Sequence, residues 1–399
     1  MNAFTPTPAF AQPDVPAMAT PTLQPGEPVL VLGAGLMGRL LACTLAGQGH
    51  PVRVYEAQGP DAQGAAARVA AAMLAPLAES AITEPPVVAM GAYSLPRWPQ
   101  LIAPLEQPVF FQQNGTLVLW HRQDQQEQVR FSQLLARTGT TVPGLPSPQA
   151  VHGTELAALE PAVMGRFAQG LYLPHEGQLD NRQLLAALLH RMQTLGVQVH
   201  WHTPLPLAQA QALQKQQGGW LLDCRGLGAQ HEWQPQQPSQ QSTKEVLRGV
   251  RGEVARIHAP DVTLQRPTRL LHPRYPIYIA PKPDHIFVIG ATEIESNDLS
   301  PISVRSTLEL LSAAYAVHPG FGEGRIVELT TQCRPTLPDN LPALAQLGPK
   351  ALQINGLYRH GFMISPAVHD AVLDWMQHGH TTLAQQLQLR FTATTPCES

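Results

Sequence analysis

The chain has 399 residues, of which 44% are hydrophobic and 14% charged, and its formal net charge at pH 7 is −3. This composition describes a soluble globular protein that is long enough for about two to three domains. The small negative charge excludes a strong field for nucleic acid or for an anionic membrane surface.

The N-terminal residues 1–27 contain no Lys or Arg and many Pro, Thr and Ala. They lack the basic and apolar parts of a secretory signal, and we predict a disordered tail. No later segment has the roughly 18 apolar residues of a membrane-spanning helix. The Gln-rich stretch 234–241 predicts a surface connection. Four scattered cysteines fit neither a zinc site nor a disulfide framework, which favours reduced thiols in a cytoplasmic protein.

The segment 28–57 carries the strongest motif of the chain. An apolar run at 29–32 leads into Gly-Ala-Gly-Leu-Met-Gly at 33–38. A helical pattern follows, and a second apolar run ends at Glu56. Strand, glycine-rich turn, helix, strand and terminal acid is the order that a dinucleotide site needs.

Each glycine of such a motif, and the terminal acid, has a physical role. Gly33 permits the tight turn, Gly35 lets the backbone approach a pyrophosphate, and Gly38 lets helix and strand pack closely. The helix N-terminus offers unpaired N–H groups to phosphates, and Glu56 can accept hydrogen bonds from the ribose hydroxyls. The predicted cofactor contacts are Gly33, Gly35, Leu36, Met37, Gly38 and Glu56. The motif alone does not separate FAD from NAD.

The segment after this unit has a less regular pattern. Residues 64–79 are rich in alanine, which suits either close packing against a flat ligand or an ordinary helix. The pattern at 109–120 predicts a hairpin with its turn at Asn114-Gly115, and 124–138 predicts a polar helix.

The second half of the chain alternates helices and strands. Asp180 or Asn181 is the candidate N-cap of a helix with one apolar stripe. A last helix is predicted to open at Ser365-Pro366, because proline is tolerated in the first turn of a helix. Further strands are predicted at 170–174, 197–201, 220–224, 251–257, 277–282, 285–292 and 326–333, and a helix at 304–318.

The order of these elements predicts the fold class. Nucleotide-type βα pieces at 28–57, 180–228 and 350–376 are far apart, with β-rich segments between them. We infer an α/β protein (α+β overall), with one nucleotide-binding domain assembled from several pieces and a second domain built from the insertions. An NAD dehydrogenase more often keeps its dinucleotide domain contiguous, so the layout favours FAD.

Four polar side chains are candidates for the chemistry. Arg334 and Arg359 lie beside rigid or glycine-rich backbone, where each could grip a carboxylate with two parallel hydrogen bonds or form a weak surface ion pair. Tyr278 could point into a cavity or lie in the core with its hydroxyl satisfied. His360 could titrate near neutral pH or be structural.

Other kinds of catalytic site are not indicated. The sequence has no GxSxG elbow, no phosphate loop and no zinc signature. The pairs His200/His202 and His378/His380 have no carboxylate or cysteine at a suitable spacing, so no metal site is predicted. A redox cofactor that carries the hard chemistry fits this pattern.

Several motifs occur together in one order along the chain. They are GAGLMG with Glu56, AAAMLAPLAE at 70–79, the Asn114-Gly115 turn, VQVHWHTPL at 197–205, RGEV at 251–254, YIAPK at 278–282, VIGAT at 288–292, RPTLPDNLP at 334–342 and GLYRHGFMISPA at 356–367. With these motifs the chain from Val29 to Met376 resembles the flavin-dependent oxidases of the D-amino-acid oxidase family, and most closely the glycine oxidases linked to thiamine biosynthesis.

The resemblance implies a glutathione-reductase-type Rossmann FAD domain and a substrate domain with a large antiparallel sheet. With the layout above, the FAD domain is expected at 28–85, 150–245 and 326–380, the substrate domain at 86–149 and 246–325, and a C-terminal tail at 381–399. Further non-covalent FAD contacts are implied at Met73, Leu74, Val199, Gly226, Arg359, His360, Gly361, Phe362 and Met363.

The resemblance also implies the reaction. Arg334 matches the arginine that holds the substrate carboxylate, Tyr278 matches its helper, and Arg359 is the third residue assigned to catalysis. The implied reaction converts glycine or another small amino acid or amine, with O2, into a 2-oxo acid, ammonia and H2O2. A homo-oligomer, and a thiazole synthase that receives the imine, are partners that the resemblance leaves open.

Two departures from the glycine-oxidase pattern keep alternatives open. Where glycine oxidases commonly have Arg-Asn-Gly, this chain has Arg359-His360-Gly361, which is closer to sarcosine oxidases. Cys333 falls near the cysteine that carries covalent flavin in sarcosine oxidases, although the adjoining Arg-Pro resembles the non-covalent glycine oxidases. A sarcosine or D-amino-acid oxidase, and a dehydrogenase with another electron acceptor, are the alternatives. The acidic charge argues against a tRNA-modifying flavoprotein, and the Tyr278/Arg334 pair against a non-catalytic one.

Overall fold

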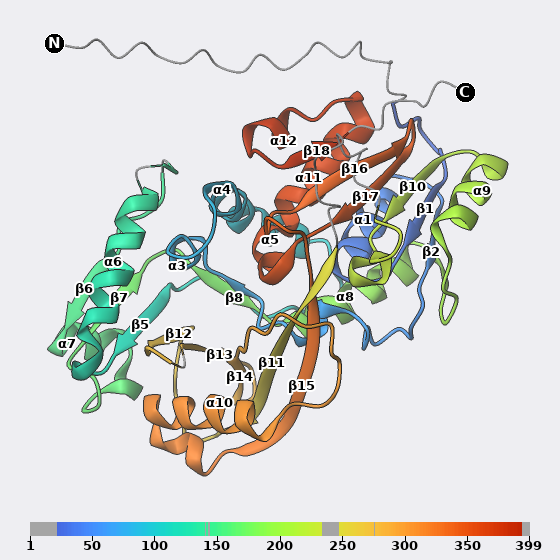
Figure 1. The fold of residues 1–399 in the computed structure, drawn as a ribbon. Coiled ribbons are helices and arrows are strands. Elements are labelled where there is room, and N and C mark those ends of the chain that lie inside the picture. Colours follow the sequence, from blue (N-terminus) through green and yellow to red (C-terminus); the bar gives the residue numbers. More distant parts are fainter. Residues whose placement is uncertain (1–21, 140, 143, 234–246, 275, 393–399) are drawn as a thin grey trace, which may run out of the picture.

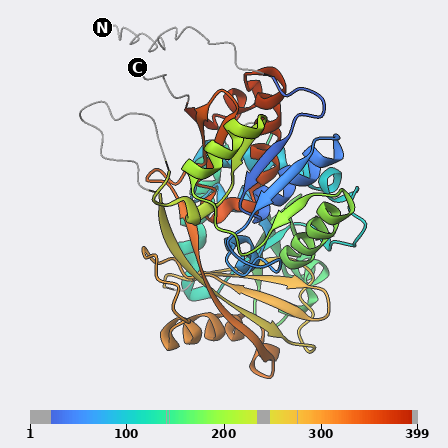
Figure 2. The same cartoon turned by 90° about the vertical axis from the view of Figure 1, so that its right-hand side faces the viewer.

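The structure is a computed structural model, and it describes residues 22–139, 141–142, 144–233, 247–274 and 276–392. Figures 1 and 2 show two large sheets at opposite ends of the molecule, one of seven strands and one of eight. Within the described ranges, no helix is long and apolar enough to cross a membrane.

The seven-stranded sheet is mostly parallel. Its strands are β1 (Val29–Leu32), β2 (Val52–Tyr55), β9 (Gln198–His200), β10 (Trp220–Asp223), β16 (Ala343–Gly348), β17 (Ala351–Asn355) and β18 (Arg390–Thr392). The order is β18-β16-β17-β10-β1-β2-β9, and the β16–β17 pair is antiparallel. Every residue of β1 and of β10 is buried, as is typical of parallel strands covered on both faces.

Helices cover both faces of this sheet. On one face, Val31 of β1 packs in a core with α1 (Leu36–Gly47) and α11 (Gly361–His378). On the other face, Leu32 packs with α9 (Leu207–Gln217). Alternate residues of one strand therefore enter two different cores, which is the layering of a doubly wound α/β domain and agrees with the predicted fold class.

The eight-stranded sheet is mostly antiparallel. Its strands are β5 (Thr116–Trp120), β6 (Gln149–His152), β7 (Gln169–Leu173), β11 (Arg248–His258), β12 (Thr268–Leu271), β13 (Ile277–Lys282), β14 (Ile286–Gly290) and β15 (Arg325–Thr336). The order is β15-β11-β14-β13-β12-β5-β7-β6, in which β12 and β5 are parallel. α10 (Val304–Val317) packs on one face through Leu310 and Ala314.

Shorter elements connect the two sheets. A third sheet has the order β4-β8-β3, and its strands are β3 (Met73–Leu74), β4 (Phe111–Gln112) and β8 (Gly177–Leu179). The other α-helices are α2 (Ala66–Val69), α3 (Pro76–Glu79), α4 (Pro85–Ser94), α5 (Trp98–Ile102), α6 (Gln125–Gly139), α7 (Gly153–Leu159), α8 (Asn181–Thr194) and α12 (Thr382–Gln386). Short 3₁₀ turns lie at Leu95–Arg97, Arg122–Asp124, Pro161–Val163, Gly226–Ala229, Pro319–Gly322 and Tyr358–His360.

The N-cap of α8 is Asp180, one of the two predicted candidates. Its carboxylate accepts hydrogen bonds from the backbone N–H groups of Arg182 and Gln183, both at 2.9 Å. These bonds satisfy donors that have no partner within the helix, which is why an acidic or small polar residue is favoured there.

The alanine-rich segment is not one helix. It forms α2, then β3, then α3, and Ala72 between the first two has a left-handed φ of +53°. Of the two interpretations offered by the sequence, the ordinary helix is wrong. High helix propensity is overridden here because the backbone must turn along a ligand-sized cavity, described below.

The predicted hairpin at 109–120 is also wrong. Gly115 does adopt a turn conformation, with φ +82°, but β4 pairs with β8 whereas β5 pairs with β7 and β12. The chain leaves one sheet for another at this turn. An Asn-Gly dipeptide predicts a tight turn, but it does not determine which strands pair on either side of that turn.

The last long helix begins earlier than predicted. α11 begins at Gly361, so Pro366 lies inside the helix and not at its start. Proline has no N–H to donate to the carbonyl of Phe362, four residues earlier. The indole Nε1 of Trp98 donates to that carbonyl instead, at 2.9 Å. This buried bond lets the helix continue through the proline.

The expected domain boundaries differ from the observed strand positions in two places. β15 and the strands β6 and β7 lie in the eight-stranded sheet, although 326–336 and 150–173 were expected in the FAD domain. The C-terminal tail prediction is wrong for 382–392, because α12 and β18 form there and β18 pairs with β16.

The N-terminal tail prediction is wrong for its described part. The N–H of Leu23 donates to the carbonyl of Met376 at 2.7 Å, and Glu27 accepts a hydrogen bond from the Trp220 indole at 3.0 Å. Residues 1–21, the Gln-rich stretch 234–241 and the chain from 393 onward lie outside the described residues.

Candidate active site

A cavity of about 1700 Å³ lies between the two large sheets and receives residues from both. At the end formed by the seven-stranded sheet, the predicted residues that line it are Gly33, Gly35, Leu36, Met37, Glu56, Met73, Gly226, Arg359, His360, Gly361, Phe362 and Met363. At the other end it is lined by Tyr278 and Arg334. Segments far apart in the sequence therefore meet around one space.

The glycine-rich turn is packed as the motif requires. Gly33 has φ +89°, and a Cβ atom there would lie 2.8 Å from the carbonyl oxygen of Cys224. A Cβ atom on Gly38 would overlap the carbonyl of Gly33. Gly38 therefore serves the packing of helix against turn, and it does not itself line the cavity.

The N-terminus of α1 opens into the cavity without a cap. The N-cap residue is Gly35, which has no side chain to accept a hydrogen bond from the helix, and the first turn contains no acidic residue. A Cβ atom on Gly35 would meet only the Cβ of Ala65, at 3.7 Å, so the space beside it is open. Unpaired N–H groups at the positive end of a helix, next to open space, suit a phosphate group.

Glu56 is fixed at the end of β2. Its carboxylate accepts hydrogen bonds from the N–H of Ala34 at 2.6 Å and of Gln58 at 2.9 Å. A carboxylate has about four acceptor positions, so capacity remains for the hydroxyls of a ribose. The fixed acid and the uncapped helix together fit the adenosine diphosphate half of a dinucleotide.

Two buried basic side chains, Arg39 and Lys282, hold this end of the cavity, and neither is among the predicted site residues. Arg39 donates from Nε to the carbonyl of Ala34, inside the glycine-rich turn, at 2.7 Å. Lys282 donates from Nζ to the carbonyls of Ala71 and Leu179, each at 2.8 Å. Burial lowers the pKa of Lys282 to about 7. The two side chains fix the turn and the alanine-rich wall, respectively.

Besides Gly38, two predicted cofactor contacts lie away from the cavity. Leu74 is buried in a core with Trp98, and Val199 on β9 packs against the core of the seven-stranded sheet. Neither belongs to the cavity lining. A side chain on a strand points to alternate faces, so a neighbour of a lining residue such as Met73 points the other way.

Arg334 lies on β15 at the other end of the cavity. Its two terminal nitrogens donate to the carbonyls of Thr292, at 3.1 Å, and Arg251, at 3.3 Å. The guanidinium covers Gly252, where a Cβ atom would overlap it. A glycine at 252 thus provides the space in which this guanidinium lies flat against the sheet.

Tyr278 lies near Arg334 in the same region of the cavity. It pairs with Gly290 across β13 and β14, and its hydroxyl would lie 2.5 Å from a Cβ atom on that glycine. Burial raises the pKa of the Tyr278 hydroxyl, and the charge of Arg334 opposes the rise. The hydroxyl is therefore protonated at neutral pH and can donate a hydrogen bond.

Arg359 belongs to a cluster of charges that the sequence did not reveal. Its terminal nitrogens lie 3.0 Å from Glu293 and 3.3 Å from Glu79, and Arg269 also donates to Glu79. Burial alone would raise the pKa of Glu79, but the charges of Arg269 and Arg359 hold it at about 2. These acids and Arg269 all line the cavity.

His360 is buried against the same carboxylate. Its Nδ1 lies 3.5 Å from Glu79, and its Nε2 lies 3.2 Å from the Thr83 hydroxyl. Burial lowers the pKa of His360 to about 4, although the charge of Glu79 opposes the change. The ring is therefore neutral at pH 7, which favours the structural interpretation over a group that titrates near neutrality.

We predict that His360 makes folding sensitive to acid. Between pH 6.5 and about 4 the unfolded chain binds a proton at this side chain and the folded chain does not, so the unfolding free energy falls as pH is lowered. The loss approaches about 1.4 kcal/mol per pH unit. The unfolding free energy is measured by denaturant titration at several pH values, and for His360→Asn it should change less steeply with pH in that range. A slope equal to that of the wild type and of the exposed-site control His152→Asn would contradict the assignment.

Comparison with known proteins gives the family. The model of the FAD dependent oxidoreductase family (DAO) matches residues 28–375. A thiamine biosynthesis oxidoreductase, ThiO, of Rhizobium etli is 38% identical over 346 residues, which cover 85% of this chain and 93% of that protein. A bifunctional ThiO/ThiG protein of Synechocystis is 27% identical, and this chain matches about half of it, 52% of its length.

Solved structures share the fold. Glycine oxidase from Geobacillus kaustophilus has a TM-score of 0.69 at 22% identity, covering 89% of this chain and 96% of that one. Glycine oxidase from Bacillus cereus has a TM-score of 0.71 at 18% identity, covering 91% and 97%. The two-sheet architecture, the uncapped helix beside an open cavity and the match of the family model along most of the chain agree. The protein belongs to the family of FAD-dependent oxidoreductases.

Proposed function

We propose that this protein oxidises glycine or another small amino acid to an imine, which hydrolyses to a 2-oxo acid and ammonia, while O2 is reduced to H2O2. The observation that carries the proposal is the pair of Arg334 and Tyr278 in the same cavity as an uncapped helix N-terminus. Arg334 and Tyr278 together suit a carboxylate, and the helix N-terminus suits a pyrophosphate.

The residues present fit FAD. Gly35 and the N-terminus of α1 would hold the pyrophosphate, Glu56 the ribose, and the alanine-rich wall with Met73 the flat ring system. FAD, when bound, supplies the hydride acceptor and is reoxidised by O2. Non-covalent attachment is supported by Cys333, because its thiol contacts the carbonyls of Ser296 and Asp298 and burial raises its pKa.

Arg334 would orient the substrate by its carboxylate. A guanidinium has five N–H donors, and two of them are used on the carbonyls of Thr292 and Arg251. The remaining donors and the Tyr278 hydroxyl are available to a carboxylate. Such a clamp fixes the Cα–H bond of the substrate, and positioning of this kind supplies most of the catalysis without a protein base.

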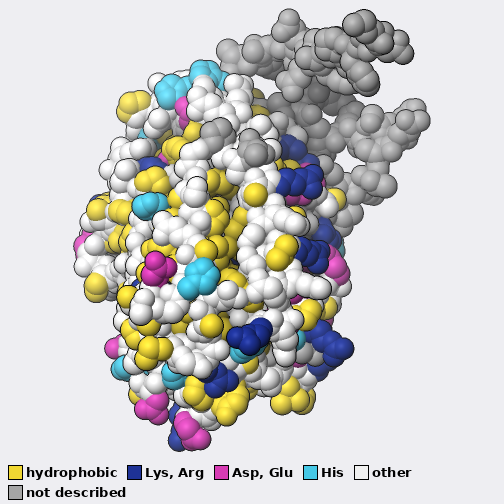
Figure 3. All heavy atoms as spheres, turned by 90° about the vertical axis from the view of Figure 1, so that its left-hand side faces the viewer, with side chains coloured by type: hydrophobic (Ala, Val, Ile, Leu, Met, Phe, Trp, Pro, Cys, Tyr) yellow, Lys and Arg dark blue, Asp and Glu magenta, His cyan; other side chains and the backbone are white. Residues whose placement is uncertain are grey.

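The charge cluster around Arg359 would have a supporting role. Because Glu79 and Glu293 already pair with its guanidinium, Arg359 is less suited than Arg334 to hold a substrate carboxylate. We therefore propose that Arg359 shapes the cavity wall at the flavin side. Charged side chains on the face in Figure 3 are scattered among hydrophobic and neutral ones, which suits a small substrate better than a nucleic acid.

A link to thiazole formation is part of the proposal. The relative from Rhizobium etli is named for thiamine biosynthesis, and in the ThiO/ThiG proteins a segment similar to this chain is joined to a second unit in one polypeptide. Such fusions support a thiazole synthase as the partner that receives the imine. Sarcosine stays as the second candidate substrate, because His360 at the cavity wall matches the sarcosine-oxidase pattern.

The first test identifies the substrate and the electron acceptor. Purified protein is mixed without oxygen with glycine, sarcosine, D-alanine or D-proline, and the visible flavin spectrum is recorded. We expect glycine or sarcosine to bleach the flavin, air to restore it, and peroxide to form in proportion. Restoration by a quinone without peroxide would identify a dehydrogenase instead. Acid precipitation should leave the flavin colour in the supernatant, and colour in the pellet would mean covalent attachment.

Arg334→Ala tests the carboxylate clamp. We expect KM for the amino acid to rise by a factor of about 100 or more, because a charge-assisted pair of hydrogen bonds contributes on the order of 3 kcal/mol. FAD content should stay unchanged, since Arg334 lies at the far end of the cavity. An unchanged KM for every amino acid in the panel would remove Arg334 from the site.

Gly252→Ala tests the position of the same guanidinium. The added methyl group occupies the place of the Arg334 side chain, which is flexible and can move aside. We expect KM to rise by about tenfold while the melting temperature changes little. The matched control is Gly139→Ala, at a glycine with open space around it. Equal KM values for the two variants would contradict the seating of Arg334 on Gly252.

A further inference from the structure

The side chains of Arg251 and Glu253, in the RGEV segment at 251–254, have no role in the reaction proposed above, yet they form a buried ion pair. Arg251 and Glu253 are 5% and 1% exposed, and they lie two residues apart on the same face of β11. The Nε and a terminal nitrogen of Arg251 donate to one oxygen of Glu253, at 3.1 and 2.6 Å. A buried pair of this kind adds little net stability compared with packed apolar residues, so its other contacts matter.

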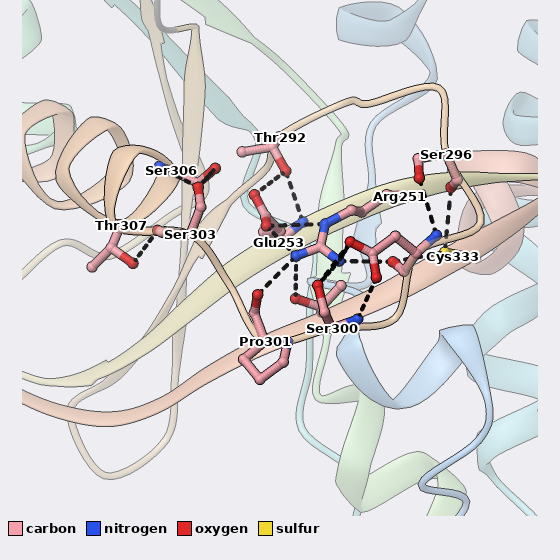
Figure 4. A network of polar contacts seen from close by, with 12 residues as sticks. Arg251, Glu253, Thr292, Ser296, Ser300, Pro301, Ser303, Ser306, Thr307 and Cys333 are labelled. Atoms are coloured by element: carbon pink, nitrogen blue, oxygen red, sulfur yellow. Dashed lines mark hydrogen bonds and ion pairs between the residues drawn. The ribbon is translucent and has the colours of Figure 1, made fainter.

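Those contacts reach the loop between β14 and α10, residues 291–303. Arg251 donates to the carbonyl of Asp298 at 2.7 Å. It also donates to the carbonyl of Pro301 at 3.1 Å (Figure 4). The backbone of Arg251 also pairs with Ile294 in both directions, at 2.8 and 3.0 Å. Arg251 thus ties the loop to β11 at Ile294, Asp298, Ser300 and Pro301.

Glu253 holds the start of the same loop. One carboxylate oxygen accepts from the hydroxyl of Thr292 at 3.0 Å, and the N–H of Glu253 donates to that hydroxyl at 3.0 Å (Figure 4). The N–H of Thr292 donates in turn to the carbonyl of Glu253 at 3.3 Å. Thr292 is therefore held from both its side chain and its backbone.

The loop carries a partner of Arg334 and a partner of Arg359. The carbonyl of Thr292 accepts from Arg334, and the carboxylate of Glu293 pairs with Arg359 at 3.0 Å. The second acceptor of Arg334 is the carbonyl of Arg251 itself, the arginine of the buried pair. Both hydrogen bonds that orient the clamp thus end on residues held by this network.

The strand that bears Arg334 contacts the same loop from behind. The thiol of Cys333, the preceding residue, lies 3.5 Å from the carbonyl of Ser296 (Figure 4). It lies 3.6 Å from the carbonyl of Asp298. The Asp298 carbonyl also accepts a hydrogen bond from Arg251. One carbonyl of the loop is therefore in contact with both the buried ion pair and β15, the strand that carries Arg334.

We propose that Arg251 and Glu253 are positioning residues that act through Thr292 to set the place of the Arg334 guanidinium, and with it the affinity of the site for a carboxylate. The inference rests on the proposed function in one respect, the assignment of a carboxylate ligand to Arg334. Neither residue of the pair needs to touch the substrate.

The variants are Glu253→Gln and Thr292→Val, with Glu160→Gln as the matched control. Glu253→Gln removes the charge of the pair, and Thr292→Val removes only the hydroxyl and keeps the carbonyl. Glu160 is also fully buried and pairs with Arg266 at 3.4 Å, but it lies outside the cavity lining. All proteins are studied as holoenzymes with their FAD.

The readouts separate positioning from folding. Acetate, a simple carboxylate, is titrated against the flavin absorption spectrum to give Kd, and KM and kcat are measured with the best amino acid of the panel. We expect Kd and KM to rise about tenfold, equivalent to about 1.4 kcal/mol, in both test variants. We expect kcat to change less than about twofold and flavin content not at all, with Glu160→Gln like the wild type.

Several outcomes would overturn the inference. Wild-type acetate affinity in Thr292→Val would do so, and that variant decides the matter if Glu253→Gln does not fold. An equal loss of acetate affinity in Glu160→Gln would show that removing any buried carboxylate weakens binding, whether or not it contacts the loop. If acetate binds the wild type, and binds both test variants more weakly as expected, but no amino acid bleaches the flavin, the positioning role stands and the proposed substrate is wrong. No acetate binding to the wild type would overturn both.

Discussion

The nucleotide end of the molecule depends on the register of β1 between β2 and β10. Leu32 pairs with Tyr55 on one side and with Asp223 on the other, so three parallel strands end at the same edge of the sheet. The glycine-rich turn and Glu56 follow directly at this edge. The left-handed backbone at Gly33 keeps the turn close to β10, and a larger residue would push the strands apart.

The substrate end depends on a different pair of strands. β11 and β15 run antiparallel along most of their length, and they carry Gly252 and Arg334, respectively. Each end of the cavity is therefore built on its own sheet. The placement of the two sheets on either side of the cavity sets the distance between the helix N-terminus and the carboxylate clamp, so changes far from the cavity can alter how the two ends match.

The sequence predicted what depends on local backbone chemistry. The turn at Gly33 and the acid at Glu56 follow from a strand–turn–helix–strand order that short-range rules describe. The cluster of Glu79, Arg269 and Glu293 could not be predicted, because each is an ordinary charged residue until sheet packing brings the three together. The hairpin and the boundaries of α11 failed for a related reason: the strand partners of β5, and the Trp98 bond that accommodates a proline, lie far away in the sequence.

The strand order of the seven-stranded sheet has a consequence for the kinetics of folding. Val29 of β1 pairs with Trp220 of β10, and Leu221 of β10 pairs with Ala351 of β17. Each of the two central strands β1 and β10 therefore gains its second neighbour only after a large part of the chain has been synthesised. Closing such long loops is slow, and the apolar faces of β1 stay open until it happens. The strand edges that later pair with β10 and β17 therefore stay open while the chain is being made, and unpaired edges of this kind favour aggregation.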